Sequence, residues 1–352
     1  MKKQILIISF LLLQVQIFGQ FDNIFASVKG DANKFITNYT RPAIEGLLAS
    51  SSSGWSTSAK ILKPFHIRLS ASVAGAIIDE EKETFTFNES DYSNLYLESG
   101  SSELPTVMGG DSSSSILIRI PDEENNVIKV LSFNAPDGIK KYLDLPMDLN
   151  AVPAPNVQFS MGLPLGFEGT LRYFPKIVSD DGAYIQVFGI AGKHSITQYF
   201  GAKKDEEGNK IKRHFFASLF ATYQDIDAGL IDSDNDEDEA TLHLHSVSAE
   251  LLASFDYKMI TIYSAVGYTK AESTFKVEGS YDYTYTLLDI DSQMPSGSET
   301  VTVTDPIIDL YYNKTGIKGT LGVKLNLLLV RVFADVTMQD YPVVNMGVAI
   351  KL

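Results

Sequence analysis

Strands whose two faces differ sharply in polarity dominate this sequence and restrict the folds open to it. One example is Leu327–Val336, LLLVRVFADV. Side chains alternate along a strand, so one face would carry Leu329, Arg331, Phe333, Asp335 and Thr337. The other would carry only Leu328, Val330, Val332, Ala334, Val336 and Met338. This pattern suits a soluble sandwich, with the apolar face in the core, or an outer-membrane barrel, with the apolar face in lipid.

The alternation recurs along most of the chain and predicts an all-β fold, a transmembrane antiparallel β-barrel of about ten strands. We expect strands near residues 60–78, 156–165, 167–176, 183–197, 212–225, 240–256, 259–278, 315–325, 327–339 and 343–352. Turns on one side are short, whereas 79–155, 225–239 and 279–315 are long and polar, as in outer-membrane barrels. The runs ILIRI (116–120) and VIKVLSF (127–133) allow a range of 8–14 strands, or form a loop subdomain over the mouth.

The first 20 residues have the features of a secretory signal peptide. Lys2 and Lys3 precede the apolar run Ile5–Leu13, which is too short to span a bilayer. Its removal would change the net charge from −15 to −15 − 2 = −17. No later run reaches the ~18 apolar residues of a membrane helix, so an exported chain of this kind can enter a membrane only as a closed barrel. We therefore expect export to the outer membrane.

Residues 21–59 differ from the rest of the chain. Apolar residues recur at roughly helical spacing, interrupted by Pro42, and a serine-rich stretch follows. We expect one short helix or two, on the periplasmic side or plugging the barrel mouth, followed by a barrel over 60–352 that carries a large external insertion at 79–155.

Charged residues on the predicted inward faces are the main candidate site. They are Arg68, Arg172, Glu250, Lys318, Lys324, Arg331, Asp335 and Lys351. The excess of cations could give a basic lumen that favours anionic solutes. Alternatively, the cations pair with carboxylates in an interior filled by side chains, as in small barrels.

Metal and enzyme chemistry have weaker support in the sequence. Carboxylates at Asp232, Asp234, Asp236 and Asp238 are spaced like the first half of a calcium loop, but the expected glycine is Glu237 and the closing glutamate is His243. This run predicts at most a weak site for divalent cations, and no cofactor is expected. His194 and Ser195 would point to opposite faces, so we predict no enzyme, with an outer-membrane hydrolase as the alternative.

The composition excludes some partners. The chain has no cysteine, which rules out disulfides and thiolate metal sites. Its acidic balance argues against nucleic acid, because phosphate binding needs an excess of Lys and Arg.

Several motifs resemble those of a known family. GWSTSAKILKPFHIRLSASV (54–73), GLPLGFEGTLRYFPKI (162–177), GIAGKHSITQYF (189–200) and the tail from Tyr311 are similar to uncharacterised Bacteroidota proteins with signal peptides, presumed to be outer-membrane barrels. The layout of a helical start before a barrel is remotely similar to long-chain fatty-acid transporters, whose N-terminal segment plugs the lumen. The resemblance implies a porin-like passage for a small or hydrophobic solute, or a structural or surface-binding element. A soluble periplasmic β protein is a second alternative.

Overall fold

The computed structural model of the chain describes residues 29–122, 127–142, 150–179, 182–201, 213–231, 238–305 and 307–351. The expected signal peptide and the acidic run at Asp232, Asp234 and Asp236 lie outside these residues. Asp238 begins a strand, but its side chain is not among the described parts.

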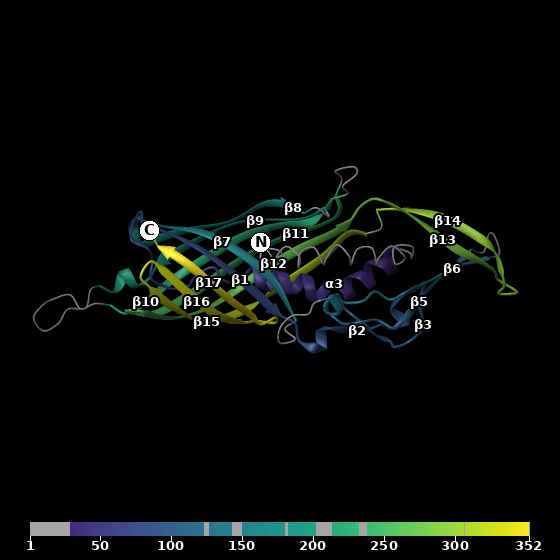
Figure 1. The fold of residues 1–352 in the computed structure, drawn as a ribbon, viewed down its shortest axis with the longest axis horizontal. Coiled ribbons are helices and arrows are strands. Elements are labelled where there is room, and N and C mark those ends of the chain that lie inside the picture. Colours follow the sequence, from purple (N-terminus) through teal and green to yellow (C-terminus); the bar gives the residue numbers. More distant parts are fainter. Residues whose placement is uncertain are drawn as a thin grey trace, which may run out of the picture.

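A closed barrel of ten antiparallel strands forms the main body of the molecule, which confirms the predicted fold class (Figure 1). Its strands, in barrel order, are β1 (Ile67–Ile77), β7 (Ala151–Leu163), β8 (Phe167–Val178), β9 (Ala183–Ser195), β10 (Phe215–Ile231), β11 (Asp238–Tyr257), β12 (Ile260–Val277), β15 (Ile307–Leu327), β16 (Val330–Met338) and β17 (Val343–Lys351). β1 closes the sheet because Leu69 lies opposite Phe159 of β7 on one side and Ile350 of β17 on the other.

The two ends of the barrel differ in their connections. At one end, called here the short-turn end, tight turns join β7 to β8, β11 to β12 and β15 to β16. The last of these turns is Leu328–Leu329, later than the boundary predicted near residue 326, and Leu328 takes the left-handed conformation with φ 51°. The C-terminal strand also ends here, on the left of Figure 1. The opposite, long-loop end carries the large insertions.

Outward and inward faces of the barrel strands separate by polarity as the alternation predicts. On β16, Val330, Val332 and Met338 are exposed, whereas Phe333 and Asp335 are buried. The other strands continue this exposed apolar surface around the barrel.

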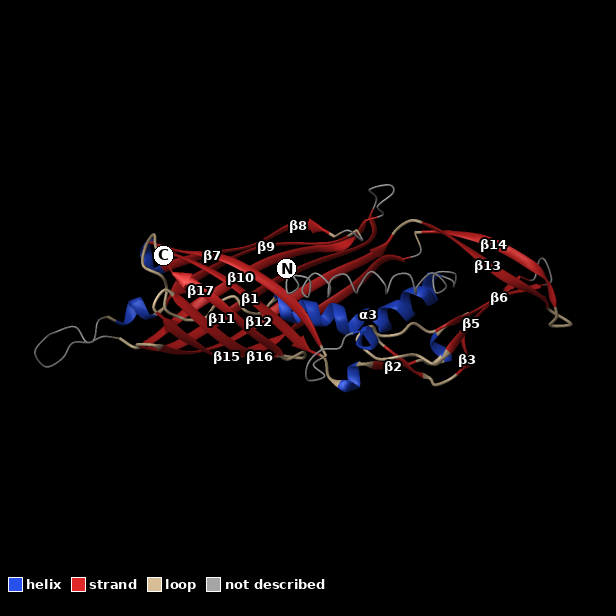
Figure 2. Ribbon diagram, viewed as in Figure 1, coloured by secondary structure: helices blue, strands red, loops and turns tan. Residues whose placement is uncertain are grey.

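One helix, α3 (Lys29–Ser51), occupies the mouth at the long-loop end (Figure 2). It runs through Pro42 without a break, so the proline does not divide the described residues into two helices. The helix is held by tertiary packing, which offsets the backbone hydrogen bond that proline cannot make. Its last turn is fixed to the wall by the Ser50 hydroxyl, which donates to the carbonyl of Val152 (2.6 Å) and accepts from the amide of Ala76 (2.9 Å). Among the described residues, no helix has the length and apolar character needed to cross a bilayer.

A separate β subdomain extends from the long-loop end, on the right of Figure 2. It contains a five-stranded sheet, in the order β14 (Pro295–Thr304), β13 (Ser280–Asp289), β6 (Val127–Asn134), β5 (Ser115–Asp122) and β3 (Leu95–Ser99), and a pair of β2 (Thr84–Thr86) with β4 (Glu103–Pro105). The runs at 116–120 and 127–133 therefore add no strand to the barrel. The contribution of 280–304 to the same sheet was not predicted.

A single hydrophobic core joins α3, this subdomain and the inward face of the barrel near the long-loop end. Phe35 of α3 is fully buried and packs edge-on against Phe85 and Phe87 of the insertion. Leu244 of β11 and Phe275 of β12 belong to the same cluster from the barrel wall. The helix therefore ties the subdomain to the barrel.

Candidate functional site: a plugged lumen and a basic cavity

Residues 51–62, called here the plug segment, run from the end of α3 through the barrel interior toward the short-turn end. The segment is serine-rich and has no strand partner. Buried carbonyl groups require donors, and a segment outside a helix or sheet must find them elsewhere. Here the donors are side chains of the barrel wall.

Arg172 of β8 makes the most extensive contact with the plug segment. Its guanidinium donates to the carbonyls of Ser51 (2.7 Å) and Ser53 (3.0 Å) and to Oε1 of Gln224 (2.7 Å). The same group lies 3.7 Å from the ring centroid of Trp55, in cation–π geometry. Arg172 is fully buried. One charged donor thus satisfies two backbone carbonyls of the plug segment.

Three lysines hold further carbonyls of the plug segment. Lys318 donates to Ser52 (2.8 Å), Lys324 to Thr57 (3.1 Å) and Lys193 to Ser58 (3.1 Å). Neutral donors complete the set: Gln158 bonds the carbonyl of Gly54 (2.8 Å), and Ser218 bonds that of Ala59. Wall side chains therefore hold seven of the twelve plug-segment carbonyls.

Carboxylates balance part of this positive charge. Glu250 forms an ion pair with Lys318 at 2.8 Å. Glu168 accepts from Arg68 at 2.8 Å and from Lys193 at 2.9 Å, and its other oxygen accepts from the amide of Leu62 at 2.8 Å. Glu168 is thus the centre of a buried network that fixes the last residue of the plug segment, Leu62, at the short-turn end.

Glu168 and Lys193 were missed as site residues, although the sequence carries a signal for both. Glu168 shares strand phase with Thr170 and Arg172, and Lys193 shares phase with Ser195. An extension of the inward-face assignment to these two strands would have included them.

The fit between plug segment and wall is close. Gly54 adopts a left-handed φ of 70°, and a Cβ there would lie 2.8 Å from Oδ1 of Asn345. A Cβ at Gly189 would lie 2.7 Å from the ring of Trp55. Beside the segment is a cavity of about 20 Å³, lined by Trp55, Lys318 and Asp335 among others, with room for about one water molecule. The two glycines let the segment bend and let its tryptophan meet the wall.

Asp335, the aspartate of the LLLVRVFADV strand, lies in the same interior. Its Oδ2 accepts from the hydroxyl of Tyr263 (2.7 Å) and from the amide of Asn345 (2.8 Å). Arg331, four residues earlier on the same face, instead donates to Asn326 (3.1 Å) at the short-turn end. The two charges on this strand therefore belong to different parts of the lumen.

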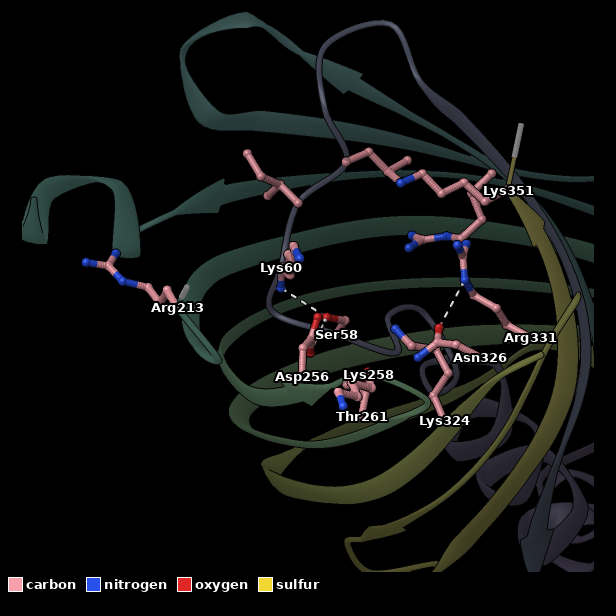
Figure 3. Close-up of a pocket in the computed structure, with 13 residues that line it drawn as sticks. Ser58, Lys60, Arg213, Asp256, Lys258, Thr261, Lys324, Asn326, Arg331 and Lys351 are labelled. Carbon is pink, nitrogen blue, oxygen red and sulfur yellow. Dashed lines mark hydrogen bonds between the residues drawn. The ribbon is translucent and has the colours of Figure 1, made fainter. Parts of the chain in front are cut away.

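Between the plug segment and the short-turn end, a basic cavity of about 310 Å³ opens (Figure 3). Its lining includes seven cationic side chains and one carboxylate, Asp256. The cations are Lys60, Arg68, Arg213, Lys258, Lys324, Arg331 and Lys351. They come from the plug segment, the turns and four different strands, so only closure of the barrel brings them together.

The acidic run predicted to collect divalent cations lies outside the side chains that the structure describes, and the hydrolase features are not assembled in the described part of the chain. There, no group of three or more His, Cys, Asp or Glu side chains could hold a metal ion. His194 contacts the hydroxyl of Tyr199 at 2.8 Å, while Ser195 is buried on the opposite face. Ser58 donates to Asp256 at 3.3 Å inside the lumen, and His243 and His245 lie on the outer surface beside Asp227 and Glu272.

The chain belongs to a family of unknown function, DUF6588, whose model matches residues 1–352. No curated protein sequence matches it. Solved structures with which the chain aligns include the following three. Ail, the attachment invasion locus protein of Yersinia pestis, is 7% identical (TM-score 0.23; 82% of this chain, 100% of that chain). The translocator domain of autotransporter NalP from Neisseria meningitidis is 8% identical (TM-score 0.30; 93% and 100%). The transport unit of autotransporter AIDA-I from Escherichia coli is 8% identical (TM-score 0.29; 89% and 98%).

Proposed function

We propose that this member of the DUF6588 family is an integral outer-membrane β-barrel, sealed by its plug segment, that anchors the β subdomain as a surface-binding element. The observation that carries the proposal is an apolar belt on the outside of the barrel. On β10 the outward residues are apolar from Phe215 to Tyr223, nine residues, and Asp225 and Asp227 follow. Nine to eleven residues is about the length that a tilted strand needs to cross a bilayer.

The apolar belt ends within one residue pair on neighbouring tilted strands. Strand register places Tyr223 beside Val247 and Asp225 beside His245. On the next pair, Ala249 lies beside Tyr268, Val247 beside Lys270, and His245 beside Glu272, with which it interacts at 3.0 Å, so the apolar row of β12 ends one residue pair earlier than that of β11. A common boundary between apolar and charged rows supports a lipid surface, because each strand of a spanning barrel leaves the hydrocarbon at one depth.

Exposed aromatic rings mark the other edge of the belt. They are Phe167, Tyr199, Phe200, Phe215, Phe255 and Tyr257, all at the short-turn end. Aromatic girdles at both interfaces are typical of outer-membrane barrels. In such barrels the short turns face the periplasm, which would place the β subdomain outside the cell.

Membrane fractionation and electrical recording test this proposal together. We expect the full chain to remain with outer membranes through urea washing, to require detergent for extraction, and to migrate differently on gels before and after heating. In planar bilayers it should produce no lasting conductance, because the plug segment is bonded to the wall. Release by urea would overturn the membrane assignment in favour of a soluble periplasmic protein, and an open channel would overturn the sealed state.

A gated solute passage is the second candidate, favoured by the polar attachment of the plug segment. The segment is held mainly through backbone carbonyls, which can exchange partners, and Trp55 and Ala59 are its buried apolar anchors. The chain has no cysteine, so engineered disulfides can test movement directly. The Oγ atoms of Ser58 and Ser254 are 3.3 Å apart, which suits a Ser58→Cys/Ser254→Cys lock between plug and wall.

The matched control links wall to wall. Thr320→Cys/Thr337→Cys joins β15 to β16 at a pair whose hydroxyls are 2.8 Å apart. A gated passage predicts solute entry that the plug lock blocks, that a reductant restores, and that the control pair does not affect. Equal solute entry through the wild-type chain, the plug-to-wall variant and the wall-to-wall control would exclude gating by this segment.

We further propose that the barrel is not an enzyme. Ser58 donates to the carboxylate of Asp256, but the imidazole that contacts Asp256 among the described residues, that of His214, bonds its backbone carbonyl and not its carboxylate. Ester and peptide substrates should therefore be turned over equally slowly by the wild-type chain and by Ser58→Ala. A rate lost in Ser58→Ala would establish the hydrolase alternative.

A further inference from the structure

We infer that the basic cavity at the short-turn end is a binding site for a phosphate-bearing anion. The cavity carries seven cationic side chains and one carboxylate, although the whole chain has a net charge of −15. These positive side chains repel one another, and a bound anion would offset that repulsion. The lining therefore provides a local field of one sign, which raises the concentration of anions at this mouth.

Three of the seven cations already have partners inside the protein. Arg68 pairs with Glu168, Lys324 donates to the carbonyl of Thr57, and Arg213 donates to the carbonyls of Thr197 and Phe200. The single carboxylate, Asp256, accepts from Ser58 and Ser254. These contacts fix the walls of the cavity.

The other four cations have no ion-pair partner among the residues that the structure describes. Lys60 lies over the ring of Phe216 (4.9 Å), Lys258 near the ring of Tyr257 (5.9 Å), and Arg331 beside Asn326. Lys351 lines the same space from β17. Arg331 and Lys351 come from the neighbouring strands β16 and β17, and Figure 3 shows both on the same side of the cavity, with Lys60 of the plug segment on the other. Apart from the Nε–H of Arg331, which donates to Asn326, their donors remain available to a ligand.

Charge, donor type and size together indicate the ligand class. A guanidinium offers paired donors that match two phosphate oxygens, and the lysines add point charges around them. The volume of about 310 Å³ is at the small end of ligand pockets, which suits a phosphate ester or a diphosphate group rather than a long polymer. Such a group could belong to a soluble phosphate compound or to a phospholipid head group at the same mouth.

Calorimetric titration of the full chain with pyrophosphate tests the inference. The protein is held in micelles of a nonionic, phosphate-free detergent at low salt, where screening is weak. We expect saturable binding at one site and at least a tenfold loss of affinity in Arg331→Gln/Lys351→Gln. The matched control, Lys34→Gln/Lys270→Gln, removes the same charge from exposed positions away from the cavity and should bind like the wild-type chain. Heat-modifiable migration verifies that each variant is folded.

Two outcomes would overturn the site: no saturable binding by the wild-type chain, or equal weakening in the cavity and control variants. A second arm identifies the source of the anion. If nanodiscs of phosphatidylglycerol abolish pyrophosphate binding by the wild-type chain, the lipid head group occupies the cavity. If binding is unchanged, the ligand is a soluble phosphate compound, and either result supports the site.

Discussion

The barrel is built in opposite ways at its two levels. In the belt region, the outer face is apolar and the interior is polar, with Ser248 and Glu250 facing inward between the outward Val247 and Leu251. Toward the long-loop end, the same strand turns Leu244 inward, into the core around α3, and His243 and His245 outward. The same hydrogen-bonded strands run through both levels, and the levels differ in which face of the sheet is apolar.

This reversal separates two kinds of filling. Around α3 the interior excludes water through burial of aliphatic and aromatic side chains, which stabilises by about 25 cal/mol per Å² of apolar surface. In the belt region the exterior is apolar and, in the proposed membrane location, contacts lipid, so the interior can hold charges and a backbone segment bonded to them. The helix thus acts as a hydrophobic anchor, and the plug segment below it as a polar filling.

The largest expected effect comes from the hydrophobic anchor. Phe35→Ala removes a fully buried ring at the junction of α3 and the subdomain. We expect a loss of about 3–5 kcal/mol in the free energy of unfolding, because the cavity cannot collapse fully. Urea denaturation in lipid vesicles, followed by the fluorescence of the single tryptophan, measures it. Met294→Ala, at a side chain 68% exposed on the β subdomain, is the control, and equal losses would mean that α3 is not packed in a core.

A charge on the outer face distinguishes the two levels directly. Leu251→Lys places an ammonium group in the apolar belt, and His243→Lys places the same group on the same strand face above it. We expect the first to cost about 2–4 kcal/mol in bilayers and the second to be close to neutral. Reversible unfolding in vesicles provides both values. Similar costs at the two positions would place the lipid boundary elsewhere.

A substitution in the polar filling should lower the free energy of unfolding by less. Arg172→Met leaves the carbonyls of Ser51 and Ser53 without their charged donor, which should cost about 1.5–3 kcal/mol. It should also shift the emission of Trp55, which then loses its cation–π partner. Arg331→Met, whose guanidinium contacts Asn326 away from Trp55, is the control. An unchanged Trp55 spectrum in Arg172→Met would contradict the assigned contact.

Much of this arrangement could be predicted from periodicity alone. Ten strands followed from alternation of apolar and polar residues, because a strand that faces lipid on one side must keep period two. The reversal is also visible in the sequence, although the predicted strand assignment did not use it. Apolar residues occupy even positions at Leu242 and Leu244 and odd positions from Val247 to Phe255.

The contacts of the plug segment could not be predicted. A serine-rich extended segment has no period, and its donors lie more than 100 residues away, as Arg172 does from Ser51. The basic cavity is similar, since Lys60 and Lys351 meet only when β1 pairs with β17. Such sites depend on closure of the barrel and not on local pattern.

The smallest expected effect concerns one neutral bond to the plug segment. Gln158→Leu removes the donor to the carbonyl of Gly54 but keeps a side chain of similar volume. Removal of a single neutral hydrogen bond should cost about 0.5–1.5 kcal/mol, measured by the same urea titration. Gln198→Leu, at an exposed position bonded to Leu165, should cost less. A loss as large as that of Phe35→Ala would mean that the polar filling around Gly54, whose backbone is left-handed, stabilises the barrel as strongly as the hydrophobic anchor. The two levels would then contribute equally to the free energy of unfolding, although their compositions differ.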